Sequence, residues 1–410
     1  MPPSSTTGWS SDLREIIPLY RSVILDRTVR MLYGWIGMRK EIAHMTDSTR
    51  IYEIAVVLGD GIGPEVCRPT IDVLKAALGK SRFLRFIEYP GGANHFLKTG
   101  QALPDETLEG CRKADAILHG AAGLPGVLHP DGTEAGQDFS LKLRFTLDLY
   151  ANVRYIKLFD GIASCLRNAP PVKIDYVIVR ENVEGLYASR GGGVNLRDMV
   201  VSDSLIITRQ GTERIARFAF NLARKRNGAP ADGRRRVTVC DKANVLRSYA
   251  FFRKVCTEVA RDYPDVELEY VLVDAMTAHM VARPDHFDVV VTENMFGDII
   301  SDLGAATVGG LGISPTAELG DGHGYFQAAH GSAPDIAGKG VANPTGTILS
   351  GALMLDWLAD RHRDPFLAKT AAKIRAAVAD LFSQGAILTR DLGGTATTGD
   401  VAESICRVVS

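Results

Sequence analysis

Short apolar runs rich in β-branched residues alternate with helical patterns along most of the chain, and this alternation restricts the fold more than any other feature. Such alternation is typical of α/β proteins whose strands are mainly parallel. The strand-like runs are 54–58, 116–119, 176–179, 237–240, 268–273 and 288–292. The helical patterns include 66–78, 211–226, 249–262 and 367–384. We therefore predict an α/β protein with a mainly parallel sheet.

Length and composition argue against several functional classes. With 410 residues, 46% of them hydrophobic, the chain has material for two or three domains, or for two lobes of one compact enzyme. Its 47 basic residues balance its 48 acidic ones, so we expect no nucleic-acid partner. No apolar run reaches the ~18 residues of a membrane span, so we expect no membrane partner. Six scattered cysteines without a C-x-x-C pair indicate reduced thiols and a cytoplasmic setting.

The first 50 residues differ from the rest. Residues 1–10 are polar and typical of disorder, whereas 13–42 mix apolar residues, arginines and acids. The acids argue against a transit peptide, and no apolar segment with a small-residue cleavage site marks a secretory signal. We expect the compact enzyme to begin near Ile51. Residues 1–50 are then an extension, either disordered or the product of a wrongly assigned start, with Met45 as the candidate start.

The strongest chemical signal is a set of three aspartates. Asp298 and Asp302 are four residues apart, so a helix would place both carboxylates on one face, where they repel unless a cation lies between them. Asp274 ends a predicted strand. Carboxylates without histidine or cysteine suit Mg²⁺ or Mn²⁺. A lone pair at this spacing is more often a solvated helix face, but the flanking residues here are apolar.

Three arginines form a second signal. Arg144 and Arg154 are ten residues apart, and Arg180 ends the strand-like run 176–179. Guanidinium groups bind carboxylates bidentately, so together they predict an anionic substrate with more than one carboxylate. Taken singly, each arginine is more often part of a surface ion pair.

Candidate acid–base residues follow two of the strands. Tyr187 comes seven residues after Arg180, and Lys242 and Asn244 lie just past the run 237–240. A lysine that is desolvated or close to other cations has a lowered pKa and serves as a base. The alternative is an ordinary surface lysine.

Two glycine-rich segments are candidate nucleotide loops. Residues 59–64 follow the first strand, but Pro64 occupies the place of the third glycine of a Rossmann fingerprint. In the loop 330–338, small residues allow backbone N–H groups to approach a pyrophosphate. Asp335 would accept hydrogen bonds from ribose hydroxyls and repel a 2′-phosphate. An ordinary surface turn is the alternative for this loop.

Together these segments resemble the β-decarboxylating dehydrogenases, a family that includes 3-isopropylmalate, isocitrate, homoisocitrate and tartrate/D-malate dehydrogenases. The likeness spans nearly all of residues 51–410, and its motifs are 58–65, 152–154, 179–187, 241–245, 292–302, 330–338 and 343–345. The resemblance implies an open α/β fold of the isopropylmalate dehydrogenase type, without a Rossmann motif. It implies a large domain from 51–149 and 309–410, and a small domain, 150–308, that forms a homodimer. Residues 191–207 would then be an arm that pairs with the partner subunit.

The resemblance also implies roles for individual residues. Tyr187 would be the catalytic acid and Lys242 the base, and Lys242 and Asp274 would reach across from the neighbouring subunit. The implied substrate contacts are Arg144, Arg154, Arg180, Asn244 and Val245. The implied metal ligands are Asp274, Asp298 and Asp302. The implied NAD contacts are His330, Gly331, Ser332, Ala333, Pro334, Asp335 and Asn343.

The implied reaction is the NAD-dependent oxidative decarboxylation of a 3-substituted malate. Asp138 and Ser140 stand where isocitrate enzymes commonly place a serine and an asparagine, and an ionised Asp138 would repel a third carboxylate. We therefore rank 3-isopropylmalate or another 3-alkylmalate first, D-malate and tartrate next, and isocitrate and homoisocitrate last. Gln327 stands where many members carry a glutamate close to the nicotinamide.

Two readings from other classes stay open. A metal-dependent hydrolase would use the same aspartates, but it has no need of the loop 330–338. A non-catalytic partner subunit would have lost a base or metal residue, whereas this chain keeps Lys242, Tyr187 and all three aspartates.

Overall fold

A computed structural model describes residues 50–79, 84–166, 173–190 and 192–410. Residues Tyr52–Ser410 form one compact unit, which begins next to Ile51, where we expect the enzyme to start. The expectations for residues 1–49, including the extension and the candidate start at Met45, lie outside the described residues.

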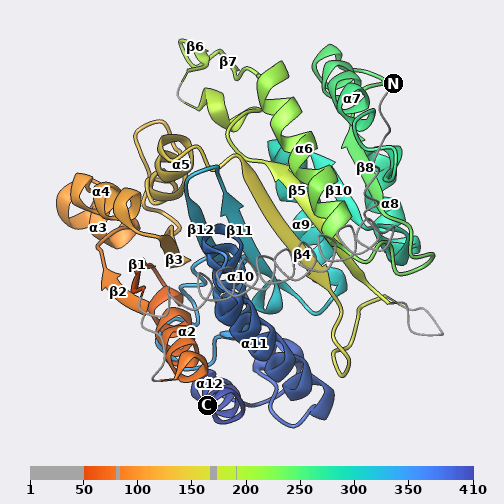
Figure 1. The fold of residues 1–410 in the computed structure, drawn as a ribbon. Helices are drawn as coiled ribbons and strands as arrows, with labels where there is room; N and C mark the ends of the chain where they lie inside the picture. The colour runs from red at the N-terminus through yellow and green to blue at the C-terminus, as the bar shows by residue number, and fades with distance from the viewer. Residues whose placement is uncertain (1–49, 80–83, 167–172, 191) are drawn as a thin grey trace, which may run out of the picture. The chain divides into compact units, whose positions relative to one another are not determined.

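Ten strands form one mixed sheet in the order β2-β1-β3-β12-β11-β4-β5-β10-β8-β9 (Figure 1). The strands are β1 Tyr52–Gly59, β2 Leu84–Glu88, β3 Ala116–Ala121, β4 Ala151–Lys157, β5 Asp175–Glu181, β8 Arg236–Asp241, β9 Glu267–Leu272, β10 Val289–Thr292, β11 Pro315–Leu319 and β12 Gly324–Ala328. Each strand-like run predicted from the sequence overlaps one of them. The runs of valine and isoleucine are almost fully buried, as expected for strands covered on both faces.

The sheet consists of two parallel halves that run in opposite directions. Strands β2, β1, β3 and β12 are parallel to one another, and so are β5, β10, β8 and β9. Strands β11 and β4 join the halves through antiparallel pairs. The prediction of a mainly parallel sheet is confirmed, and the antiparallel centre is an addition that only the structure shows.

The centre of the sheet brings distant parts of the chain together. Strands β11 and β12, from the last hundred residues, lie between β3 and β4. Strands β5, β8, β9 and β10 all belong to the segment 150–308, for which we predict the smaller domain. The division into 51–149 with 309–410 against 150–308 stays a prediction.

Helices cover both faces of the sheet (Figure 1). One face packs against α2 Gly63–Leu78, α6 Arg209–Lys225, α7 Arg247–Ala260, α10 Thr345–His362, α11 Pro365–Gln384 and α12 Thr398–Val409. The other packs against α3 Ala93–Thr99, α4 Asp105–Lys113, α5 Gln137–Thr146, α8 Val273–Ala282 and α9 Asn294–Thr307. Short 3₁₀ turns span Tyr187–Ser189, Pro284–His286, Leu311–Ile313 and Arg390–Leu392.

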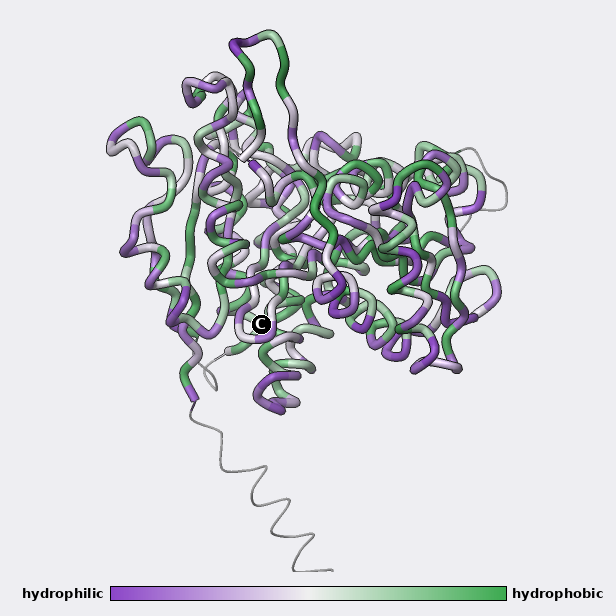
Figure 2. The backbone as a smooth tube through the Cα atoms, turned by 90° about the horizontal axis from the view of Figure 1, so that it is seen from above, coloured by the Kyte–Doolittle hydropathy of each residue, from purple (hydrophilic) through white to green (hydrophobic). Residues whose placement is uncertain are grey.

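The apolar core differs between the two faces. On the first face a single cluster runs from α2 to α7 and includes Leu74, Phe220 and Leu355. On the second face the packing is divided into two clusters, one around Phe139 and the other around Ile300. Hydrophobic segments run through the middle of the molecule, and the helices that cover them alternate between hydrophobic and hydrophilic along their length (Figure 2). The charged residues of the candidate site lie on elements of both second-face clusters.

Helix α8 corrects one expectation from the sequence. We expected Asp274 to end a strand, but β9 ends at Leu272, and Val273 and Asp274 form the first turn of α8. A carboxylate in the first turn is favourable because it faces the unpaired N–H groups of the helix. Asp274 is therefore held at a helix start rather than at a strand end.

A fully buried carboxylate fixes the loop after β1. Asp60 accepts hydrogen bonds from the backbone N–H groups of Ala93 (2.6 Å), Asn94 (2.9 Å) and Gly123 (2.9 Å). Two of these donors belong to the first turn of α3, so Asp60 joins the first loop of the enzyme to that helix. Burial of a backbone N–H without an acceptor is costly, so Asp60 holds these segments together.

The change Asp60→Ala is expected to lower the free energy of unfolding by about 2–4 kcal/mol, because it removes the acceptor of three backbone N–H groups, two of them in buried hydrogen bonds. Urea denaturation followed by circular dichroism measures this change. The exposed Asp160→Ala serves as the matched control and should stay within about 0.5 kcal/mol of the wild type. A loss below 1 kcal/mol for Asp60→Ala would show that water replaces the carboxylate.

The segment for which we expect an inter-subunit arm contains a two-stranded hairpin. Strands β6 Val194–Leu196 and β7 Val200–Ser202 pair with each other and lie outside the main sheet (Figure 1). Its apolar side chains are exposed, with Met199 at 85% and Val201 at 68%. Among the helices of the described residues, none combines the length and the apolar character needed to cross a membrane.

Candidate active site

A row of polar side chains crosses the antiparallel centre of the sheet. Arg180 of β5 pairs with Asn152 of β4, which pairs with Glu318 of β11, which in turn pairs with Tyr325 of β12. Directly paired residues point to the same face of a sheet, so these four side chains lie side by side. Two residues along the strands, a second row joins Arg154, Thr316 and Gln327 on this same face.

Arg180 is the most deeply buried cation of the site. Its side chain is 1% exposed, and its guanidinium donates to Asn294 Oδ1 from Nε (3.0 Å) and from Nη2 (2.7 Å). Its Nη1 forms an ion pair with Asp298. Burial lowers the pKa of Arg180 to about 10, so the guanidinium stays protonated near neutral pH.

Helix α9 carries the two aspartates predicted to share one face. The helix begins at Asn294, and the side chain of Glu293 caps it by accepting from Phe296 N (2.8 Å). Burial raises the pKa of Asp298, but Arg180 and Arg154 outweigh this, so the net pKa lies below its ordinary value. Asp298 is thus a carboxylate held between cations, while Asp302 lies exposed one turn further on.

Tyr187 and Arg154 complete the surroundings of Asp298. The hydroxyl of Tyr187 donates to Asp298 Oδ2 at 3.1 Å, and Arg180 lies over the tyrosine ring at 5.5 Å from its centre. Arg154 Nη2 lies 3.7 Å from Asp298 Oδ1, and Arg154 Nε donates to Asn152 Oδ1 at 2.9 Å. Burial raises the pKa of Tyr187, which keeps its phenol protonated. The predicted acid therefore lies beside the predicted metal ligand and two predicted substrate arginines.

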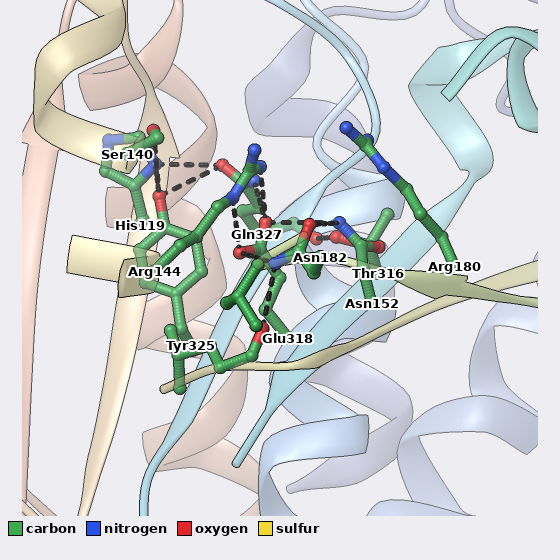
Figure 3. Close-up of polar contacts among 12 residues, drawn as sticks. His119, Ser140, Arg144, Asn152, Arg180, Asn182, Thr316, Glu318, Tyr325 and Gln327 are labelled. Atoms are coloured by element: carbon green, nitrogen blue, oxygen red, sulfur yellow. Dashed lines mark hydrogen bonds and ion pairs between the residues drawn. The ribbon is translucent and has the colours of Figure 1, made fainter. Parts of the chain in front are cut away.

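Arg144 has a different partner from the other two arginines. It lies in the last turn of α5, and its Nε and Nη2 each donate to one oxygen of Glu318 at 2.7 Å. Glu318 is fully buried, and Arg144 is 11% exposed. The guanidinium groups of Arg144 and Arg180 lie on the same side of the sheet (Figure 3). The structure therefore brings the three predicted arginines to one site, with Arg144 already paired to a carboxylate.

An uncharged network extends from Glu318 to β3. Gln327 Nε2 donates to Glu318 Oε1 at 3.0 Å, and Gln327 Oε1 lies 3.0 Å from His119 Nδ1 (Figure 3). The hydroxyl oxygen of Tyr325 lies 2.7 Å from His119 Nδ1 and 3.5 Å from Ser140 Oγ. Burial lowers the pKa of His119 to about 4, so this histidine is neutral. Gln327, expected near the nicotinamide, is the link between this network and Glu318.

Lys242 and Asp274 form a separate pair. Lys242 Nζ donates to Asp274 Oδ1 at 2.7 Å, and the aspartate side chain is 65% exposed. Asn244 and Val245 follow and are exposed as well. Within the described part of one chain, no three histidine, cysteine or carboxylate side chains converge as metal ligands. One chain therefore offers Asp298 and Asp302 together, and Asp274 elsewhere beside Lys242.

The expectation that Asp138 faces the substrate is wrong. Its carboxylate lies 2.9 Å from His129 Nε2 and 3.1 Å from Arg190 Nη1. Asp138 and Lys142 are one turn apart on α5, on a different side of the helix from Ser140 and Arg144. The negative charge of Asp138 is therefore paired with Arg190 on that side of the helix, away from the face that carries Arg144.

The two glycine-rich loops pack against each other. Gly61 has φ = 54°, and a Cβ there would lie 1.8 Å from the carbonyl oxygen of Ser332. The N–H of Ile62 donates to this same oxygen at 2.8 Å. Glu65, at the start of α2, accepts hydrogen bonds from the backbone of Gly338 and Ala342, each at 3.0 Å. The loop after β1 thus supports the loop 330–338, although it lacks the Rossmann pattern.

The predicted cofactor residues fall into two groups. Gly331, Pro334 and Asp335 are exposed along the loop, Ser332 is buried, and Ala333 has a positive φ of 37°. His330 Nε2 is buried and has no hydrogen-bond partner among the described residues. By contrast, the side chain of Asn343 accepts from Thr345 N and donates to Asp391, so it already has partners within the chain.

Comparison with known proteins identifies the family. The sequence profile of the isocitrate/isopropylmalate dehydrogenase family matches residues 53–405. The chain belongs to this family. As a member, it is an oxidoreductase, a decarboxylating dehydrogenase that acts on a hydroxy acid.

Relatives of known name cover nearly the whole enzyme. The 3-isopropylmalate/3-methylmalate dehydrogenase of Methanocaldococcus jannaschii is 43% identical, and the match covers 88% of this chain and 99% of that protein. The 3-isopropylmalate dehydrogenase of Archaeoglobus fulgidus is 41% identical over 87% of this chain and 99% of its own. The solved isocitrate dehydrogenase of Methylococcus capsulatus is similar with a TM-score of 0.76 at 35% identity, covering 87% of this chain and 99% of that one. These matches confirm the family and fold that the motifs predict.

The sequence did not reveal several residues of the site. Asn152, Asn294 and Glu318 accept hydrogen bonds from the arginines directly, and Asn182 donates to Glu318. Asn152, Asn182 and Asn294 lie inside motifs that the chain shares with the family, and these motifs were the available signal. The signal for Glu318 was weaker. It is the second polar residue, after Thr316, in a short strand that is otherwise apolar.

Proposed function

We propose that this enzyme catalyses the NAD-dependent oxidative decarboxylation of a 3-substituted malate, with 3-isopropylmalate or a related 3-alkylmalate as the favoured substrate. The observation that carries this proposal is the convergence of Arg144, Arg154 and Arg180 beside Asp298 and Tyr187. Such a set binds a dicarboxylate next to a proton donor. Two similar relatives named for 3-isopropylmalate support the choice of substrate.

The arginines and the tyrosine have distinct tasks in this proposal. Arg154 and Arg180 are buried and held by asparagine side chains, so their forks are oriented before a substrate arrives. Arg144 offers its remaining N–H groups to the same substrate. Tyr187 keeps its proton and donates it to the carbon that loses CO₂. Lys242, supplied by the partner, accepts the proton of the 2-hydroxyl, and its neighbours Asn244 and Val245 contact the substrate.

The carboxylates fit a divalent cation. Asp298, Asp302 and the partner's Asp274 provide only oxygen ligands, which Mg²⁺ and Mn²⁺ prefer. Asp298 is kept ionised by its cationic neighbours, as a ligand must be. When bound, the metal supplies the positive charge that makes the substrate hydroxyl more acidic. Arg180 and Tyr187 hold Asp298 in place for this role.

The loop 330–338 fits the adenosine half of NAD. The buried Nε2 of His330 lacks a partner among the described residues, and an adenine ring offers a hydrogen bond to such a group. Glycine and alanine leave the backbone of the loop accessible to a pyrophosphate. NAD supplies the hydride acceptor of the reaction. Residues 330–335 and 343 line its site in this proposal, Asn343 through its backbone, because its side chain has partners already.

A homodimer completes the site. Among the described residues of one chain, Asp274 does not converge with Asp298 and Asp302 but pairs with Lys242, so we propose that a second copy brings the two halves of the chemistry together. The exposed apolar hairpin of β6 and β7 is the candidate surface for this pairing, because large apolar side chains such as Met199 gain most from burial. We also propose a cytoplasmic setting, in which the six free cysteines stay reduced.

A substrate panel tests the proposed function. Purified enzyme with NAD⁺ and Mn²⁺ is assayed for NADH absorbance with 3-isopropylmalate, D-malate, tartrate, isocitrate and homoisocitrate. We expect the highest kcat/KM with 3-isopropylmalate or another 3-alkylmalate. The highest kcat/KM with isocitrate would reject the proposed substrate, and the absence of NADH with every 2-hydroxy acid would reject the reaction.

The cofactor preference is a second expected result. The carboxylate of Asp335 beside the ribose would repel a 2′-phosphate by about 1–2 kcal/mol even in a watery setting, which is roughly tenfold. We expect kcat/KM for NAD⁺ to exceed that for NADP⁺ at least about tenfold. Asp335→Ala should narrow this ratio, while the exposed Asp160→Ala should not. Equal use of NADP⁺ by the wild type would contradict the assignment of Asp335.

A further inference from the structure

Glu318 is a carboxylate whose hydrogen-bonding capacity is filled from within the chain. Its Oε1 accepts from Arg144 Nη2 (2.7 Å), Gln327 Nε2 (3.0 Å) and Asn152 Nδ2 (3.4 Å). Its Oε2 accepts from Arg144 Nε (2.7 Å) and Asn182 Nδ2 (3.1 Å). A carboxylate has about four lone-pair positions, so none is left for a ligand. Glu318 therefore acts on a substrate through its charge and through Arg144.

The pairing changes what Arg144 offers to a substrate. A guanidinium has about five N–H donors, and the edge formed by Nε and Nη2 faces Glu318. The Nη1 group and one N–H of Nη2 remain. Burial raises the pKa of Glu318, but Arg144 outweighs this, so the carboxylate is ionised. Arg144 and Glu318 together form a neutral pair that can still donate hydrogen bonds.

The charges around the substrate position follow from this pairing. Asp298 and Asp302 balance a divalent cation in the proposed function, and the partner's Lys242 and Asp274 balance each other. Two arginines, Arg154 and Arg180, then remain to neutralise substrate carboxylates. The wall next to Arg144 adds no charge, because His119, Tyr325, Gln327 and Ser140 are all neutral (Figure 3).

We propose that Glu318 is a specificity-determining residue that neutralises Arg144, so that the site selects a malate with two carboxylates and an uncharged C3 substituent over one with a third carboxylate. This inference rests on the proposed function and deepens it. A third carboxylate would meet Arg144 only as half of a neutral pair, and desolvation of that carboxylate would go largely uncompensated. The ranking of substrates then follows from Glu318, and no longer from Asp138.

Glu318→Gln tests the role of the charge. The amide keeps the shape of the side chain and can still accept from Arg144, but Arg144 becomes an uncompensated cation. We expect the ratio of kcat/KM for isocitrate to that for 3-isopropylmalate to rise at least about tenfold, mainly through a lower KM for isocitrate. Glu318→Asp keeps the charge and should retain the wild-type ratio.

A binding measurement separates this inference from the proposed function. Titration calorimetry with Mn²⁺ compares two inert anions, succinate and propane-1,2,3-tricarboxylate. The wild type should bind the trianion no more tightly than the dianion, and Glu318→Gln should bind the trianion at least about tenfold more tightly than the wild type does. The binding measurement does not depend on turnover. If the enzyme oxidises no malate but binds the two anions as expected, the proposed function is rejected and the inference about Glu318 is kept.

A matched control tests for general disturbance. Asp288 is another fully buried carboxylate, paired with Arg226 at 2.7 Å at the opposite end of β10 from α9. Asp288→Asn should leave two ratios unchanged: that of kcat/KM for isocitrate to kcat/KM for 3-isopropylmalate, and that of the affinity for the trianion to the affinity for the dianion. The inference is overturned if a folded Glu318→Gln enzyme keeps the wild-type ratios within twofold, or if Glu318→Asp shifts them equally. If Glu318→Gln fails to fold, the wild type alone decides. The inference is overturned if the wild type binds the trianion at least tenfold more tightly than the dianion.

Discussion

Asp298→Asn is expected to reduce kcat/KM on the order of 10³-fold, because this partly exposed carboxylate is a proposed ligand of the metal, whose charge stabilisation is worth several kcal/mol. Asp298 forms ion pairs with Arg180 and Arg154 and accepts from Tyr187, and it is a proposed metal ligand. Loss of the charge removes the ion-pair partner of Arg180 and also weakens the binding of the metal. The apparent Kd for Mn²⁺ should therefore rise together with the fall in kcat.

Steady-state rates over a Mn²⁺ titration measure this effect. Asp262→Asn is the matched control, because Asp262 pairs with Arg217 on the exposed surface at 2.9 Å. An exposed pair contributes little, so that variant should keep wild-type rates within about twofold. If Asp298→Asn stays within tenfold of the wild type at saturating Mn²⁺, Asp298 is neither a metal ligand nor the anchor of the arginines.

The sequence was sufficient to predict the strand that carries Arg180, and to indicate that Asp298 and Asp302 share one face if they lie on a helix. Both predictions relied on local patterns, namely the i, i+4 spacing of Asp298 and Asp302 and the apolar run that ends at Val179. Local periodicity reports which face of a helix or strand is buried, so it placed these side chains well.

The antiparallel centre of the sheet was beyond such reasoning. Strands β11 and β4 pair across more than 150 residues of sequence, and no local pattern specifies which strands become neighbours. The role of Glu318 depends on that pairing, because its contacts with Asn152 and Arg144 exist only when β11 lies beside β4. The role of Glu318 could therefore not be predicted, because it depends on the long-range pairing of strands.

The prediction for Asp138 was wrong for a different reason. It was expected to face the substrate from its spacing to Arg144 alone. A separation of six residues turns a helix by about 240°, which takes Asp138 away from the face of Arg144. The residue one turn before Arg144 is Ser140, and its contact with Tyr325 places it in the network around Gln327.

Mixing two inactive variants is expected to restore activity. Lys242→Ala and Asp298→Asn each remove a separate requirement, so each homodimer should lose on the order of 10²–10⁴-fold in kcat. If Lys242 acts in the neighbouring subunit, a hybrid dimer has one site with both changes and one site with neither. Random exchange of chains then gives roughly a quarter of wild-type activity.

The ion pair between Lys242 and Asp274 supplies the matched control for this experiment. The two side chains are 2.7 Å apart in one chain, so they would enter the same neighbouring site together. A mixture of Lys242→Ala and Asp274→Ala chains therefore leaves every hybrid site damaged and should show no recovery. Native mass spectrometry confirms that hybrids form. If hybrids of Lys242→Ala and Asp298→Asn form without recovery, Lys242 serves its own chain, and the proposal of a shared site is rejected.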